Sequence, residues 1–298
     1  MAARSGAAVH PQYLGRLAAQ DQPRHGRSRL PRHLESDPAV VAWWQQNGWQ
    51  GGPGLFAYTI DAVSGDLFIA FNGSSRTTFA RLDPDTLQLK SWYRIGLFTP
   101  GPMLVFAGRY VACKSALAGD LAIIDFDNPI GGPTLAASVD YSSHSTGLAI
   151  DPERARLYVL TESATGAEGW VSWVDAAFEK HGPWHLVDDL GLPAGSTPSG
   201  IAYDRTSGRV IIGASTGLFA CHPETLEIEQ SLLGNYSGGG FVDAWENQPT
   251  VDGELWLPFA STIHRIDAVT LTPIASCRRD IFKHNRSVAL AEWRQLAA

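Results

Sequence analysis

The sequence has little of several features that mark particular classes of protein. It contains three cysteines, Cys113, Cys221 and Cys277, without a CxxC pair. This odd number argues against a complete disulfide framework, although one bridge could form. No run of about 18 apolar residues occurs, so the sequence predicts no membrane span. The start lacks the apolar core of a secretory signal, which favours a cytoplasmic protein.

Basic charge is scarce outside the first 34 residues. That segment carries six arginines and one acidic residue, Asp21, so the rest of the chain holds 17 basic and 29 acidic residues. Such a body repels phosphate backbones, and we expect no nucleic-acid partner. Residues 1–38 are rich in Arg, Ala and Gly with Pro and His breaks, so a disordered or loosely packed arm is expected before a single domain over 39–298.

The chain is rich in short apolar runs that alternate with polar turns. In 199–235 four such runs follow one another, as expected for a four-stranded antiparallel unit. Similar units recur, and their second strands lie 43, 47, 53 and 45 residues apart, near Leu67, Tyr110, Leu157, Val210 and Leu255. Repeats of this length with four strands each predict the blades of an all-β propeller, with five consecutive blades over 54–279. The third of these blades should end with an outer strand over 185–189, and the fifth should begin with an inner strand over 240–245.

The ends of the chain bear on the number of blades. Residues 284–293 resemble the start of another blade, and propellers close their ring by building one blade from both termini. We therefore favour six blades with a composite closing blade, and five blades is the alternative.

Polar residues recur where the third strands end. The predicted strands finish at Asp83, Asp125, Asp175 and Asp267, and His222 takes this place in the fourth unit. A side chain here can accept hydrogen bonds from the backbone amides of the next turn, so we interpret these residues as structural.

Two units carry a family resemblance. Those that begin Thr146-Gly147-Leu148-Ala149 and Ser199-Gly200-Ile201-Ala202 resemble the blades of YVTN-type and NHL-type propellers. Residues 252–257 with 263–267 are similar to blades of streptogramin B lyase and gluconolactonase-like propellers. The resemblance covers roughly residues 54–280 and implies architecture more than activity. Gluconolactonase-like enzymes hold a divalent metal on their inner strands, and only Asp243 stands at a matching level here.

Candidate site residues come from the segments that precede the inner strands, because these segments would line the mouth of the channel. Histidine transfers protons near neutral pH, so His144 and His284 are candidate catalytic residues. The candidate ligand-binding residues are Tyr236, Asp243, Trp245 and Arg286. No metal-ligand set is predicted.

The sequence leaves three functions open. The favoured one is a propeller that binds a small organic molecule or glycan at the channel mouth, where it would catalyse a metal-independent rearrangement, elimination or cyclisation. The alternatives are a metal-dependent lactonase or lyase with a divalent cation such as calcium, and a non-catalytic protein-interaction platform. Three N-x-S patterns, at Asn72, Asn235 and Asn285, indicate a secretory route as the alternative to the cytoplasm.

Three further patterns suggest sites but have structural interpretations. Residues 213–217 match G-x-S-x-G, yet a strand rather than a helix should follow, so we expect a hairpin turn. His181 and His185 with two aspartates could bind a metal, but a surface loop is the expected structure. The ten tryptophans could stack on sugars as in a lectin, although packing between blades explains their strand positions better.

Overall fold

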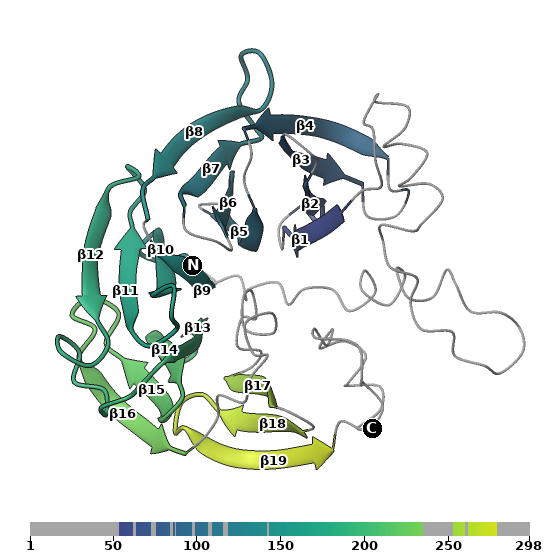
Figure 1. The fold of residues 1–298 in the computed structure, drawn as a ribbon. Helices are drawn as coiled ribbons and strands as arrows, with labels where there is room; N and C mark the ends of the chain where they lie inside the picture. Colours follow the sequence, from purple (N-terminus) through teal and green to yellow (C-terminus); the bar gives the residue numbers. More distant parts are fainter. Residues whose placement is uncertain are drawn as a thin grey trace, which may run out of the picture.

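The computed structural model describes residues 54–61, 64–72, 76–83, 86, 88–96, 99–106, 109–115, 119–141, 143–234, 253–259 and 262–278. These residues form five antiparallel sheets, which Figure 1 shows around a common axis, with β1, β5, β9, β13 and β17 innermost. In the described part of the chain, no helix is long and apolar enough to cross a membrane.

Four of the sheets have four strands each in sequence order, as the repeat predicted. We number the sheets as blades 1 to 5. Their strands are β1 Gly54–Ile60, β2 Leu67–Asn72, β3 Thr77–Leu82 and β4 Leu89–Ile95; β5 Pro100–Phe106, β6 Tyr110–Ser115, β7 Leu121–Asp125 and β8 Thr134–Val139; β9 His144–Asp151, β10 Arg156–Glu162, β11 Gly169–Val174 and β12 Lys180–His185; β13 Pro198–Asp204, β14 Arg209–Ala214, β15 Gly217–Cys221 and β16 Ile228–Leu233; and β17 Glu254–Phe259, β18 Thr262–Asp267 and β19 Thr272–Arg278.

The all-β propeller architecture is therefore confirmed, with second strands at the predicted places. Blade 5 has three described strands, because its expected inner strand over 240–245 lies outside the described residues. The expected arm, the segment over 284–293 and the closing blade also lie outside them. The choice between five and six blades stays a prediction.

One predicted strand is wrong. The outer strand of blade 3 was expected over 185–189, but β12 occupies Lys180–His185, and a turn follows it. In this turn the carbonyl oxygen of His185 accepts the amides of Asp189 and Leu190. Pro183 lies within β12, which is an outer strand with one unpaired edge, and a proline is tolerated there because its missing N–H is not needed.

Apolar clusters between neighbouring blades hold the sheets together. Side chains alternate between the two faces of each strand, so Leu148 packs in the cluster shared with blade 2, whereas Ala149 packs in the one shared with blade 4. Inner and middle strands are apolar on both faces, as in β14, while the outer strand β16 alternates between half-buried and exposed residues. The apolar content of each strand therefore decreases with its distance from the axis.

The turns between strands are built by the residues that the sequence singled out. At Asp175 the carboxylate accepts the amides of Ala177 and Glu179, both at 2.9 Å, and the amide of Glu179 lowers the pKa of Asp175. Equivalent bonds to backbone amides are made by Asp83, Asp125, His222 and Asp267. The structural interpretation of this series is confirmed.

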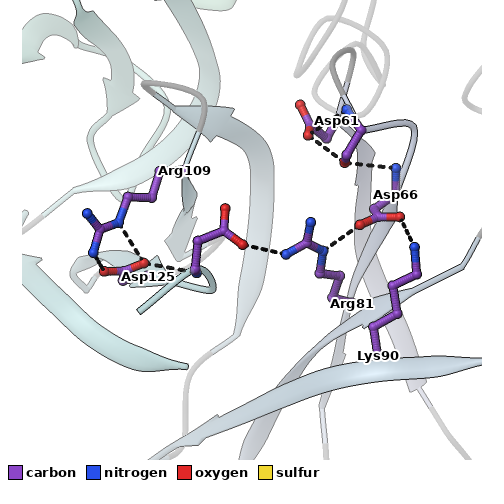
Figure 2. Close-up of polar contacts among 8 residues, drawn as sticks. Asp61, Asp66, Arg81, Lys90, Arg109 and Asp125 are labelled. Atoms are coloured by element: carbon purple, nitrogen blue, oxygen red, sulfur yellow. Dashed lines mark hydrogen bonds and ion pairs between the residues drawn. The ribbon is translucent and has the colours of Figure 1, made fainter. Parts of the chain in front are cut away.

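Polar contacts join the blades at the end opposite the starts of the inner strands. Figure 2 shows Arg81 of blade 1 beside the buried Asp66 of its own blade. The Arg81 guanidinium donates to Asp66 at 2.5 Å and to Asp127 of blade 2 at 2.6 Å. Lys90 binds the other carboxylate oxygen of Asp66. Because Asp66 is shielded from water, these two cations replace its hydration, and the contact of Arg81 with Asp127 joins blade 1 to blade 2.

The joint between blades 3 and 4 uses a backbone acceptor instead. The hydroxyl of Tyr158 donates to the carbonyl oxygen of Pro223 at 2.6 Å, and Arg156 donates to the same oxygen at 3.1 Å. Arg209 of blade 4 contacts the carbonyl of Ala268 in blade 5 in a similar way. A side chain near the start of a second strand therefore reaches the turn after the next blade's third strand.

Candidate functional site

The inner strands share an irregularity near their first residues, at the end of the blades that the sequence places at the channel mouth. In β1, β5, β9 and β13 one extra residue interrupts the pairing with the second strand. The extra residue is Thr146 in β9 and Ser199 in β13. Such β-bulges bend a strand and re-aim a side chain, and they are frequent at rims and beside binding sites. The bulges therefore define a rim of related positions.

The two bulge residues on blades 3 and 4 carry hydroxyls. Thr146 is fully buried and Ser199 nearly so, and neither hydroxyl has a hydrogen-bond partner among the residues that the structure describes. The strands run close together here, since a Cβ on Gly147 would lie 3.2 Å from the backbone nitrogen of Ile201. A buried hydroxyl without a partner costs about 1–3 kcal/mol, so native proteins rarely leave one uncompensated.

A titratable pair lies beside Thr146. His144 begins β9 and stands directly opposite Glu162 of β10, so both side chains project from the same face of the sheet. Both residues are half-buried. Burial raises the pKa of Glu162, and the nearby His144 opposes this rise. The pair could therefore exchange a proton with a bound molecule.

Lys114, a buried lysine of blade 2, contacts the residue that precedes His144. The Lys114 ammonium donates to the carbonyl oxygens of Gly119 at 2.8 Å, Ser143 at 3.1 Å and Ser115 at 3.4 Å. It also lies 5.3 Å from the centre of the Tyr141 ring. Desolvation lowers the pKa of Lys114 to about 8. This cation thus ties the end of β6 to the segment that leads into β9.

Only one of the six predicted site residues lies in the described part of the chain. His144 is the first residue of the inner strand β9, close to the bulge at Thr146, and its catalytic role stays a prediction. The other five, Tyr236, Asp243, Trp245, His284 and Arg286, lie outside the described residues. Their proposed convergence with His144 stays a prediction.

Four further rim residues were not selected from the sequence, namely Lys114, Thr146, Glu162 and Ser199. Thr146 and Ser199 end two of the segments that the sequence places at the channel mouth, but only larger side chains of these segments were chosen as candidates. Lys114 and Glu162 end second strands, which carried no expectation of chemistry.

Other polar clusters have structural roles. Ser215 lies in the hairpin turn between β14 and β15, and its hydroxyl donates to the carbonyl oxygen of Gly195 at 2.9 Å, so G-x-S-x-G is a turn as predicted. Among the described residues, Asp175, Glu179 and His181 could together hold a metal ion. However, His181 already lies 3.2 Å from Asp175, and that carboxylate builds the turn described above. The expected surface loop at His181 is instead part of β12.

Cysteines and tryptophans in the described part also serve packing. Cys113 and Cys221 are buried, and desolvation raises the pKa of the Cys221 thiol to about 12, which makes it unreactive. Trp173 packs against the cluster between blades 3 and 4, with the His181 ring stacked at 3.7 Å. Trp92 is 41% exposed and lies under the Arg94 guanidinium. Packing between blades therefore explains Trp173 but not Trp92.

Comparison with known proteins identifies the architecture only. No family model and no curated protein matches the chain. The β-propeller domain of Cps50 (Swd1) from Myceliophteria thermophila is 12% identical, with a TM-score of 0.57 over 75% of this chain and 72% of that one. A chain of a nidogen/laminin complex is 11% identical, with a TM-score of 0.51 over 75% of this chain and 80% of that one.

A luciferin-regenerating enzyme is 13% identical, with a TM-score of 0.51 over 75% of this chain and 76% of that one. At such low identities the likeness concerns the fold alone. The resemblance to YVTN, NHL and gluconolactonase-like propellers is thus confirmed for architecture, whereas membership of any of these families stays a prediction. The chain is an all-β protein with a β-propeller architecture.

Proposed function

We propose that this propeller binds a small organic molecule or glycan at the channel mouth, over the rims of blades 3 and 4. The observation that carries the proposal is a pair of buried hydroxyls, Thr146 and Ser199, on the neighbouring inner strands β9 and β13. Neither hydroxyl has a hydrogen-bond partner among the described residues. A hydroxyl both donates and accepts hydrogen bonds. A ligand rich in hydroxyl or carbonyl groups would satisfy both side chains and offset the free energy that their burial costs.

Removing the hydroxyls tests the proposal. The variants Thr146→Val and Ser199→Ala delete a buried polar atom, so without ligand each should be as stable as wild type or up to about 1 kcal/mol more stable. A panel of monosaccharides, hydroxy acids and lactones is then screened by thermal shift against wild type. Ligands that raise the melting temperature of wild type should lose this effect on both variants.

The matched control is Thr272→Val, which removes an exposed hydroxyl on the outer strand β19 and should keep the ligand response. A loss of more than about 1 kcal/mol in ligand-free Thr146→Val would mean that this hydroxyl already has a partner. That result, or a panel without any binder, would contradict the proposal and favour a protein-interaction platform.

Catalysis is the second candidate, and the His144–Glu162 pair supports it. These groups face each other beside Thr146, where a metal-independent rearrangement, elimination or cyclisation would need an acid and a base. His144→Gln and Glu162→Gln should each keep binding of a ligand found in the panel but abolish its conversion, measured by product analysis. Equal conversion by wild type and His144→Gln would exclude this role.

The metal-dependent alternative rests on Asp243, which lies outside the described residues. Equilibrium dialysis with calcium and zinc separates it from the leading proposal. Stoichiometric metal that is lost in Asp243→Ala would support a lactonase or lyase of the gluconolactonase-like type.

A further inference from the structure

We infer that Lys114 is a positioning residue that holds the His144 segment at the rim through its bond to the carbonyl oxygen of Ser143. The inference deepens the proposed function, because it concerns the same rim, but it can be tested without a ligand. Ser143 directly precedes His144, and the bond crosses from blade 2 to blade 3.

The surroundings of Lys114 distinguish this contact from an ordinary ion pair. Its ammonium has three protons, and it donates to three carbonyl oxygens, of Ser115, Gly119 and Ser143. Two of these oxygens belong to the end of its own strand and the loop that follows it, and the third belongs to the segment that leads into β9. A cation that binds backbone in this way fixes the relative positions of those segments.

Tyr141 strengthens the same joint. Its backbone carbonyl accepts the amide of Gly119 at 3.0 Å, and its hydroxyl pairs with Ser172 at 2.9 Å. The ammonium of Lys180 lies 4.2 Å from its ring centre. Blade 2, the His144 segment and blade 3 therefore meet around one aromatic ring and the Lys114 ammonium.

The charge on Lys114 should change the NMR signal of the His144 imidazole. Burial holds the pKa of Lys114 at about 8, Asp120 and Asp140 raise it, the Cys113 thiol raises it, and Lys180 lowers it. Glu162 is paired with His144 across β9 and β10 and is the other titratable group beside it. When Lys114 loses its proton, it keeps two donors for three acceptors, so its hold on the segment weakens.

The test follows the His144 imidazole by ¹H–¹⁵N NMR between pH 6 and 9.5. In the intact wild-type chain, the His144 signal should shift as Lys114 titrates, with a midpoint near pH 8. Lys114→Arg keeps a permanent charge, so this shift should vanish while the signal at low pH stays close to wild type. Lys180→Met should keep the shift and raise its midpoint, because a like charge is removed.

Hydrogen exchange gives a readout that is independent of charge. Lys114→Met should speed exchange of the Ser143 and His144 amides at least tenfold, whereas Lys180→Met should leave these amides near the wild-type rate. If Lys114→Met does not fold, the comparison of Lys114→Arg with Lys180→Met still decides the question. A shift near pH 8 that persists in Lys114→Arg, or that is absent from wild type, would overturn the inference. Failure of the ligand panel alone would not affect it.

Discussion

Gly169 offers a direct test of how blades 3 and 4 fit together at the rim. It begins β11 opposite Glu162, and a Cβ at this position would lie 2.7 Å from two ring carbons of Pro198 and 2.8 Å from a methyl of Leu186. Carbon atoms normally approach to about 3.5–4.0 Å, so Gly169→Ala creates overlaps of about 1 Å. Pro198 is rigid and starts β13, so its backbone has to move.

Overpacking of this kind costs about 1–3 kcal/mol, and we expect Gly169→Ala to lower the free energy of unfolding by about 2–3 kcal/mol. Equilibrium unfolding in urea measures the change. The control is Gly96→Ala, because a Cβ there would meet nothing within 4 Å. That variant should be unchanged or slightly more stable, by up to about 1 kcal/mol, since alanine restricts the unfolded chain. Equal stability of Gly169→Ala and Gly96→Ala would refute the proposed contact between β11 and β13.

Three further predictions concern the polar contacts. Arg81→Met removes one of two cations from the buried carboxylate of Asp66 and should lower the free energy of unfolding by about 1–3 kcal/mol. Asp127→Asn removes only an exposed partner of Arg81 and should lower it by less than about 1 kcal/mol. Urea unfolding measures both changes. Burial lowers the pKa of Lys114, so the folded state releases this proton at lower pH than the unfolded state. The free energy of unfolding of wild type should therefore rise by about 2 kcal/mol relative to that of Lys114→Arg from pH 7 to pH 9.5. Parallel curves of unfolding free energy against pH for the two proteins would exclude this. Tyr158→Phe removes a hydrogen bond to the next blade and should cost about 1 kcal/mol, and an unchanged urea midpoint would contradict its role.

The sequence predicted the first four blades well because their signals are local. Alternating apolar residues and polar turns define each strand, and an aspartate at a strand end both stops the strand and builds the turn, as at Asp83 and Asp175. The error in blade 3 arose where local rules are weakest. Gly182-Pro183 reads as a breaker, but a proline on an outer strand forfeits no bond that the sheet requires.

The rim was harder to predict because it depends on register rather than on residue type. Thr146 and Ser199 become special only because each is the extra residue of a bulge, and a bulge is a property of two paired strands. Lys114 was equally hard to predict, since a lysine near a strand end is expected in solvent. Its bond to the carbonyl of Ser143, 29 residues away, forms only after the segment before β9 has packed against blade 2.

The geometry of the blades explains why we place the proposed site at this rim. Along the seams, apolar side chains from both blades fill the space. At the far end Arg81 and Tyr158 are matched to a carboxylate and a carbonyl, although the Tyr203 hydroxyl and the Arg209 Nε are buried there without a described partner. Near the start of the inner strands the bulges interrupt this matching, and polar groups remain buried without partners in Thr146 and Ser199. Because such groups cost stability, we propose that a ligand pairs with them beside His144 and Glu162 and so restores the stability that their burial removes.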